Sequence, residues 1–199
     1  MLWRKDLMMR TSVLVCGLIY SSAGIAQAGI VTLDASMTVD NSFTASISSD
    51  PNLAGDQFLS GGNWPSTYTG TFDFESPGTY YLHVHAHDAG SPEMFIGLFT
   101  LSNQDASFSN GTQRLITQAQ SDWSASISGF GGADVGLSDR GANGQSPWGF
   151  YSAMEDARFI WGDTSRDDVY FSTVITVVPA PSSLGMLCVC GLAGARRRR

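Results

Sequence analysis

The chain has 199 residues and a formal net charge of −7, with 18 acidic against 11 basic residues. Seven of the basic residues lie in the first ten and the last four positions, so residues 29–178 carry four arginines against seventeen acids, a formal net charge of −13. Such an acidic segment excludes binding to nucleic acid and to anionic lipid, because both need a basic protein surface.

The first 28 residues have the organisation of a secretory signal peptide. Three basic residues within the first ten positions precede an uncharged, mainly apolar stretch over residues 11–25. Ala26 and Ala28 then supply the small-x-small pattern that signal peptidase requires. The apolar stretch is shorter than the roughly 20 residues of a membrane span, which favours cleavage after Ala28 over a permanent anchor.

Residues 29–177 have the length of one domain, which can bury roughly 68–70% of its unfolded surface. The three cysteines, Cys16, Cys188 and Cys190, all lie outside this segment. An exported domain without disulfides depends on packing alone.

The first half of this segment alternates apolar and polar residues. Period 2 predicts strands over residues 31–39 and 43–47, with a turn or bulge at Asp40 and Asn41. A loop is expected from Gly61 to Pro65, a strand over residues 67–74, and a tight turn at residues 76–78.

The second half is richer in glycine. Strands are predicted over residues 79–87, 94–101 and 169–178, and the continuous apolar run of 94–101 indicates burial on both faces. Residues 129–149 hold seven glycines and predict a long irregular connection. Ala153, Ala157 and Trp161 share one helical face, which predicts a short helix over residues 153–161. The expected core positions between these elements are Leu115, Ile116, Trp123 and Ile127.

Many short strands separated by Gly/Pro turns predict an all-β fold, an antiparallel β-sandwich or jelly roll.

The last 22 residues, 178–199, do not continue this pattern. A proline pair prevents the closing strand from passing into a helix, and the apolar run over residues 184–195 is short for an ordinary span. A terminal basic cluster resists translocation, so the segment predicts a short hydrophobic helix that halts transiently in the inner membrane. The residues that carry this pattern are Val178, Pro179, Pro181, Arg196, Arg197, Arg198 and Arg199.

This tail resembles the PEP-CTERM sorting signal of Gram-negative exported proteins. In that family an exosortase is thought to cut near the Pro-x-Pro element and pass the protein to the cell surface or extracellular matrix. The chain departs from the family at Ala180, where a glutamate usually stands. The resemblance implies an exosortase as a partner, in addition to the signal peptidase indicated by Ala26 and Ala28.

The middle of the chain also resembles a recurrent set of PEP-CTERM proteins and, more loosely, galactose-binding-like β-sandwiches, a class that often binds carbohydrate. The pieces that carry this likeness are short and structural: Val39–Phe43, Gly62–Trp64, Tyr80–Val84, Met94–Gly97, Gly141–Gly144, Pro147–Gly149 and Phe159–Trp161. Because a fold does not set a function, the likeness supports the fold alone.

The three histidines, His83, His85 and His87, alternate along one strand and therefore share a face with Tyr81. An exposed outer face with recurring histidines is the ordinary interpretation. Two imidazoles at this spacing can also converge on a transition metal, and a pH-responsive or sugar-binding face is a further alternative.

Carbohydrate binding is a hypothesis for the aromatic loops. Trp64 and Trp148 lie among Gly, Asn and Pro residues, which favours exposed indoles that stack on a pyranose. Asp40, Asn41 and Asn63 can hydrogen-bond sugar hydroxyls or cap turns. Core positions remain the usual place for tryptophan.

No cofactor is expected. Calcium is the one ion considered, because the predicted loops contain residues with the oxygen ligands that it prefers: Asp139, Asn143, Asp163, Asp167 and Asp168. No catalytic motif is present, since the chain lacks G-x-S-x-G and residues 29–178 hold no thiol.

The sequence therefore predicts an exported, non-enzymatic β-sandwich at the cell surface or in the exopolysaccharide matrix, with a structural or adhesive role and weak carbohydrate binding. The alternatives are a secreted polysaccharide hydrolase and a metal-binding surface protein.

Overall fold

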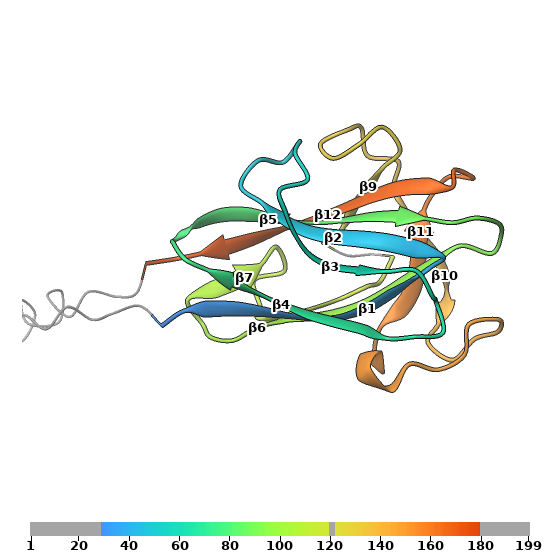
Figure 1. Ribbon diagram of the computed structural model, residues 1–199, viewed down its shortest axis with the longest axis horizontal. Helices are drawn as coiled ribbons and strands as arrows, with labels where there is room; N and C mark the ends of the chain where they lie inside the picture. Colours follow the sequence, from blue (N-terminus) through green and yellow to red (C-terminus); the bar gives the residue numbers. More distant parts are fainter. Residues whose placement is uncertain (1–28, 120–121, 180–199) are drawn as a thin grey trace, which may run out of the picture. The chain divides into compact units, whose positions relative to one another are not determined.

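The computed structural model describes residues 29–119 and 122–179, which form two six-stranded antiparallel sheets packed face to face (Figure 1). The first, called the β1 sheet, has the order β10-β11-β6-β1-β4, and β8 also pairs with β6. Its strands are β1 (Val31–Asp40), β4 (Tyr68–Phe74), β6 (Met94–Leu101), β8 (Arg114–Ile116), β10 (Leu137–Ala142) and β11 (Arg158–Gly162).

The second, called the β12 sheet, has the order β3-β2-β5-β12-β7, and β9 also pairs with β12. Its strands are β2 (Ser42–Ser48), β3 (Asp56–Gly61), β5 (Gly78–His87), β7 (Ala106–Phe108), β9 (Ser124–Ser126) and β12 (Asp168–Val177). The all-β, antiparallel sandwich predicted from the sequence is thereby confirmed.

Alternation along the strands places one apolar face of each sheet in a shared core. In β1 every odd position from Val31 to Val39 is buried, and in β12 every odd position from Val169 to Val177 is buried. The predicted strands over 31–39, 43–47, 67–74, 79–87, 94–101 and 169–178 are confirmed to within about two residues, the usual uncertainty of strand ends.

Asn41 is the single residue between β1 and β2, and here the chain passes from one sheet to the other. Asp40 pairs with Met94 in the β1 sheet, whereas Ser42 pairs with His87 in the β12 sheet. The turn or bulge predicted at this point is therefore a sheet-to-sheet crossing.

Strand β6 is buried on both faces, as its continuous apolar run predicted. Phe95 and Phe99 face the core between the sheets, whereas Met94 and Ile96 face a second apolar cluster outside the β1 sheet. That second cluster is completed by Trp148, Tyr151, Met154, Ala157 and Phe159.

The helix predicted over residues 153–161 is wrong. Only Ser152–Met154 form a single 3₁₀ turn, and Arg158–Gly162 form strand β11. Ala157 lies in the second cluster and Trp161 in the main core, so the two residues do not share a helical face. Pairing of β11 with β10 and β6 buries its apolar residues, and this burial outweighs a weak local helix preference.

Two further predictions need correction. The glycine-rich segment 129–149 is not wholly irregular, because it contains β10, which pairs with β11 across a bulge at Asp139 and Gly141. Ile127 is 41% exposed rather than in the core, and Ile116 is half-buried, whereas Leu115 and Trp123 are buried as predicted.

The predicted signal peptide, with Ala26 and Ala28, lies outside the described residues, as do the apolar run and arginine cluster of the tail. Within residues 29–119 and 122–179, no helix has both the length and the apolar character needed to cross a bilayer. Strand β12 ends at Val177, directly before the predicted sorting signal, and Val178 and Pro179 are exposed.

Candidate functional site

The three histidines project from the outer face of the β12 sheet, as their alternation on β5 predicted. Their exposure differs along the strand: His83 is fully buried, His85 is half-buried and His87 is exposed. His83 is covered by two loops, since its Nε2 lies 3.5 Å from the Asp50 carbonyl oxygen and its ring stacks on Phe130 at 4.2 Å. The prediction of a uniformly exposed face is wrong at His83.

Five rings on this face form what we call the aromatic row: Tyr81, His83, Phe130, Tyr170 and His85. Tyr81 stacks on His83 at 5.9 Å, and Tyr170 stacks on His85 at 4.5 Å with an interplanar angle of 4°. Phe130 joins the two halves, because it stacks on His83 and meets Tyr170 edge-on at 5.2 Å. Burial lowers the pKa of His83, which keeps this imidazole neutral among the rings.

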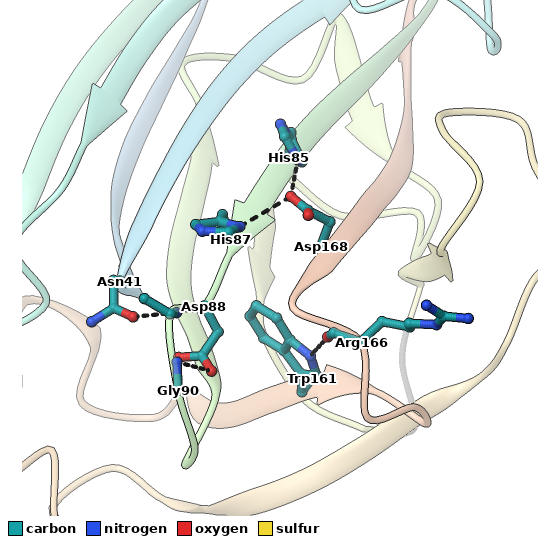
Figure 2. A network of polar contacts seen from close by, with 9 residues as sticks. Asn41, His85, His87, Asp88, Gly90, Trp161, Arg166 and Asp168 are labelled. Carbon is teal, nitrogen blue, oxygen red and sulfur yellow. Dashed lines mark hydrogen bonds and ion pairs between the residues drawn. The ribbon is translucent and has the colours of Figure 1, made fainter.

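At one end of the row, His85 and His87 converge on one carboxylate oxygen (Figure 2). The distances to Asp168 Oδ1 are 2.8 Å from His85 Nε2 and 3.2 Å from His87 Nδ1. The hydrogen bond from His85 is the largest of the contributions that lower the pKa of Asp168. These three residues line a depression of about 490 Å³ together with the start of β2.

The metal hypothesis finds no support in this geometry. His83 Nδ1 lies 2.8 Å from Ser172 Oγ and does not join His85 and His87. Across residues 29–119 and 122–179, no group of three or more His, Cys, Asp or Glu side chains is arranged to hold a metal ion. Three of the five residues considered for calcium contact protein groups instead: Asp139 pairs with Arg158, Asn143 accepts from the Tyr151 N–H, and Asp168 contacts His85 and His87.

Of the residues predicted to bind carbohydrate, Trp64 and Trp148 pack in the second cluster outside the β1 sheet, whereas the Asn41 N–H donates to the His87 carbonyl oxygen at 2.8 Å. Trp148 is only 7% exposed and donates its indole N–H to Asp40 Oδ2 at 2.9 Å, so the prediction of an exposed indole is wrong here. Trp64 is half-buried against the same cluster, and its carbonyl accepts a 2.7 Å hydrogen bond from the Tyr151 hydroxyl.

Asn41 and Asn63, which were also predicted to bind carbohydrate, make hydrogen bonds to nearby protein groups. Asn41 Oδ1 accepts from the Ala89 N–H at 2.6 Å, and Asn63 Nδ2 donates to Ser66 Oγ at 3.1 Å. Burial raises the pKa of Asp40 despite the hydrogen bond from Trp148. Burial, with the nearby Asp40 charge, raises the pKa of Tyr151 to about 12.

Asp88 follows the histidine strand and is 1% exposed. Its Oδ2 accepts from the Gly90 N–H at 2.9 Å (Figure 2), whereas its Oδ1 has no hydrogen-bond partner among the described residues. Burial is the main reason that the pKa of Asp88 is raised, and the charges of Asp40, Glu93 and Asp167 add to the effect. The ionised carboxylate is therefore poorly accommodated in the fold.

We expect Asp88→Asn to stabilise the fold at neutral pH by about 1–3 kcal/mol, since the asparagine keeps an acceptor for Gly90 and removes a buried charge. A folded-state pKa above the unfolded value of 3.8 means that the carboxyl group destabilises the fold as pH rises through the folded pKa. Urea midpoints at pH 4 and pH 7.5 test this, because the gain should shrink at the lower pH. An equal gain at both pH values would contradict it.

A second hollow, a cavity, lies beside the aromatic row. Strand β9 pairs with residues 170–172 of β12 and β7 pairs with residues 175–177, which leaves Thr173 and Val174 opposite a gap between the two short strands. Residues on both sides of this gap line a cavity of about 370 Å³. Its walls include Tyr81 and Tyr170 of the aromatic row, and Trp123 from the segment before β9.

Sequence reasoning did not find this cavity. The predicted core position of Trp123 is confirmed, and the alternation of β5 places Tyr81 on the face of the histidines without indicating a cavity. The alternation of Tyr170, Ser172 and Val174 shows that these side chains share a face, but the gap beside them depends on where β7 and β9 pair. Comparison of the chain with protein families, with curated proteins and with solved structures finds no significant match.

Proposed function

We propose that this chain is an exported protein of a Gram-negative cell surface or extracellular matrix, with a structural or adhesive role that includes carbohydrate binding. The observation that carries the binding part is the outer face of the β12 sheet, where the aromatic row joins two hollows. Aromatic faces interspersed with hydroxyl groups suit sugars, whose rings combine apolar C–H faces with polar rims. This face is a better candidate for the carbohydrate-binding surface than the loops that contain Trp64 and Trp148.

Export and sorting are supported by the two ends of the chain. The predicted signal peptide precedes β1 by a few residues, and the Pro-x-Pro element begins two residues after the end of β12. Removal of both ends would therefore leave every strand of the sandwich in place, as expected of sorting signals on a folded domain.

We expect the protein recovered from envelope and culture supernatant of its host to begin after Ala28 and to end near Pro179–Pro181. Mass spectrometry of the intact protein measures both cuts. Replacement of Arg196–Arg199 by four serines is the matched variant, and it should leave the N-terminal cut unchanged while reducing release to the surface. A full-length chain confined to the cytosol would contradict the proposal.

Retention on insoluble exopolysaccharide tests the binding role. We expect the purified protein to be retained without releasing reducing ends, since a binder holds the polymer intact. Release of reducing ends would instead favour the alternative of a secreted polysaccharide hydrolase, and the absence of retention would contradict the adhesive role.

A further inference from the structure

The cavity of about 370 Å³ beside Val174 is lined by both aromatic rings and hydroxyl groups. Its volume lies near the lower end of the range of roughly 300–1,000 Å³ seen for small-molecule sites, which suits a single sugar unit better than a long polymer segment. It lies beside Thr173 and Val174, between the stretch of β12 that pairs with β9 and the stretch that pairs with β7.

Aromatic rings form the apolar part of the walls. Tyr81 and Tyr170 are held in position by stacking on His83 and His85, and Trp123 packs edge-on against Phe95 in the core at 5.4 Å. Rings that are already fixed in the free protein lose little conformational freedom when a ligand stacks on them. Among the described residues, neither tyrosine hydroxyl has a protein hydrogen-bond partner, so both can serve a ligand.

Hydroxyl groups form the polar part. Ser109 Oγ donates to the Asp122 carbonyl oxygen at 3.3 Å and lies 3.2 Å from Thr173 Oγ1. Ser172 Oγ lies 2.8 Å from the His83 ring. Each hydroxyl oxygen has two acceptor lone pairs in addition to its donor, so these groups keep capacity for the hydroxyls of a bound sugar.

The charge of the lining decides which sugars fit. Asp122 is the one ionisable acid or base among the lining residues apart from the two tyrosines, and none of the four arginines of the described segment lines the cavity. Arg114 and Arg158 are already engaged by Asp156 and Asp139. An anionic ligand would therefore bind beside an acidic residue without any compensating cation in the lining.

From this combination we infer that the cavity binds one neutral pyranose unit and rejects uronic acids. The inference rests on the proposed carbohydrate-binding function, and it adds the location of the site and the class of sugar. The aromatic side chains stack on the C–H face of the pyranose, and the serine and threonine hydroxyls hydrogen-bond the sugar hydroxyls at its rim. Asp122 disfavours sugars that carry a carboxylate.

The test compares Val174→Phe with Thr176→Phe in the full chain. Val174 lines the cavity, whereas Thr176 is the next outward position on β12, is exposed and lies outside the lining. Calorimetric titration uses the methyl glycosides of glucose, galactose, mannose and N-acetylglucosamine, together with methyl glucuronide and methyl galacturonide. We expect at least one neutral glycoside to bind, Val174→Phe to weaken it by about tenfold or more, and Thr176→Phe to leave it unchanged.

Asp122→Asn supplies a second test that introduces no bulk. It should bring the affinity for the uronides to within a fewfold of that for the neutral sugars, while the unfolding midpoint stays unchanged. If Val174→Phe unfolds, this variant decides the question alone.

The inference is overturned if no neutral glycoside binds, if Val174→Phe binds as the unaltered protein does, or if the unaltered protein prefers the uronides. Retention of Val174→Phe on exopolysaccharide distinguishes failure of the proposed sugar site from failure of the proposed adhesive function. A variant that is still retained leaves the adhesive function standing and places the binding surface elsewhere, whereas an unaltered protein that is not retained contradicts the function itself.

Discussion

Trp161→Ala is expected to lower the free energy of unfolding by about 3–5 kcal/mol, a large part of the roughly 5–15 kcal/mol that stabilises a typical domain. Trp161 is fully buried, packs edge-on against Phe171 at 5.8 Å, and donates its indole N–H to the Arg166 carbonyl oxygen at 3.2 Å (Figure 2). Alanine would leave a cavity between the sheets and an unpaired carbonyl group. Urea unfolding followed by tryptophan fluorescence and by circular dichroism measures the loss.

Ile127→Ala is the matched control. Ile127 was expected in the core from its sequence context but is 41% exposed, so its truncation should change the free energy of unfolding by no more than about 0.5 kcal/mol. A small loss for Trp161→Ala would contradict the strand assignment of residues 158–162 and the burial of Trp161, whereas a large loss for Ile127→Ala would contradict the exposed position of Ile127.

Trp148→Phe is expected to destabilise the fold by about 1–3 kcal/mol at neutral pH, although it keeps an aromatic ring in the second cluster. The reason is Asp40, which is 7% exposed and receives its indole hydrogen bond at 2.9 Å from Trp148. Without this donor the buried carboxylate is left unpaired, and the pKa of Asp40, already raised by burial, rises further.

The pH dependence of this variant has a definite sign. The pKa of Asp40 is higher in the folded protein than its unfolded value of 3.8. Such a carboxyl group stabilises the fold below pH 3.8, and this contribution is lost as pH rises through the folded pKa. The deficit of Trp148→Phe should therefore grow from pH 4 to pH 7.5. Asp40→Asn removes the charge, so Trp148→Phe made in that background should cost less than it does alone. A cost that is equal in both backgrounds would show that Asp40 and Trp148 are not coupled.

Much of the fold could be predicted from local pattern. β1 and β12 show an apolar residue at every second position because one face of each strand is buried, and that regularity lies within a single segment. The apolar run of β6 signalled burial on two faces, although it did not reveal that Trp148 and Phe159 cover the outer one.

The errors arose where burial came from remote segments. Residues 153–161 have a helical spacing of apolar side chains, yet pairing with β6 and β10 draws Arg158–Gly162 into a strand. His83 is buried because Asp50 and Phe130, distant in the chain, close over it. Trp148 stands among loop-forming residues, and only the packing of its loop on the β1 sheet buries it.

The sequence alone determined an all-β middle without cysteine and two ends of different composition, because strand periodicity and composition are properties of contiguous residues. The tertiary structure decided which side chains reach the surface and where a ligand fits. The gap beside Val174 exists because β7 and β9 pair with different stretches of β12. Such pairing depends on contacts between segments far apart in the chain, which no short window of sequence contains.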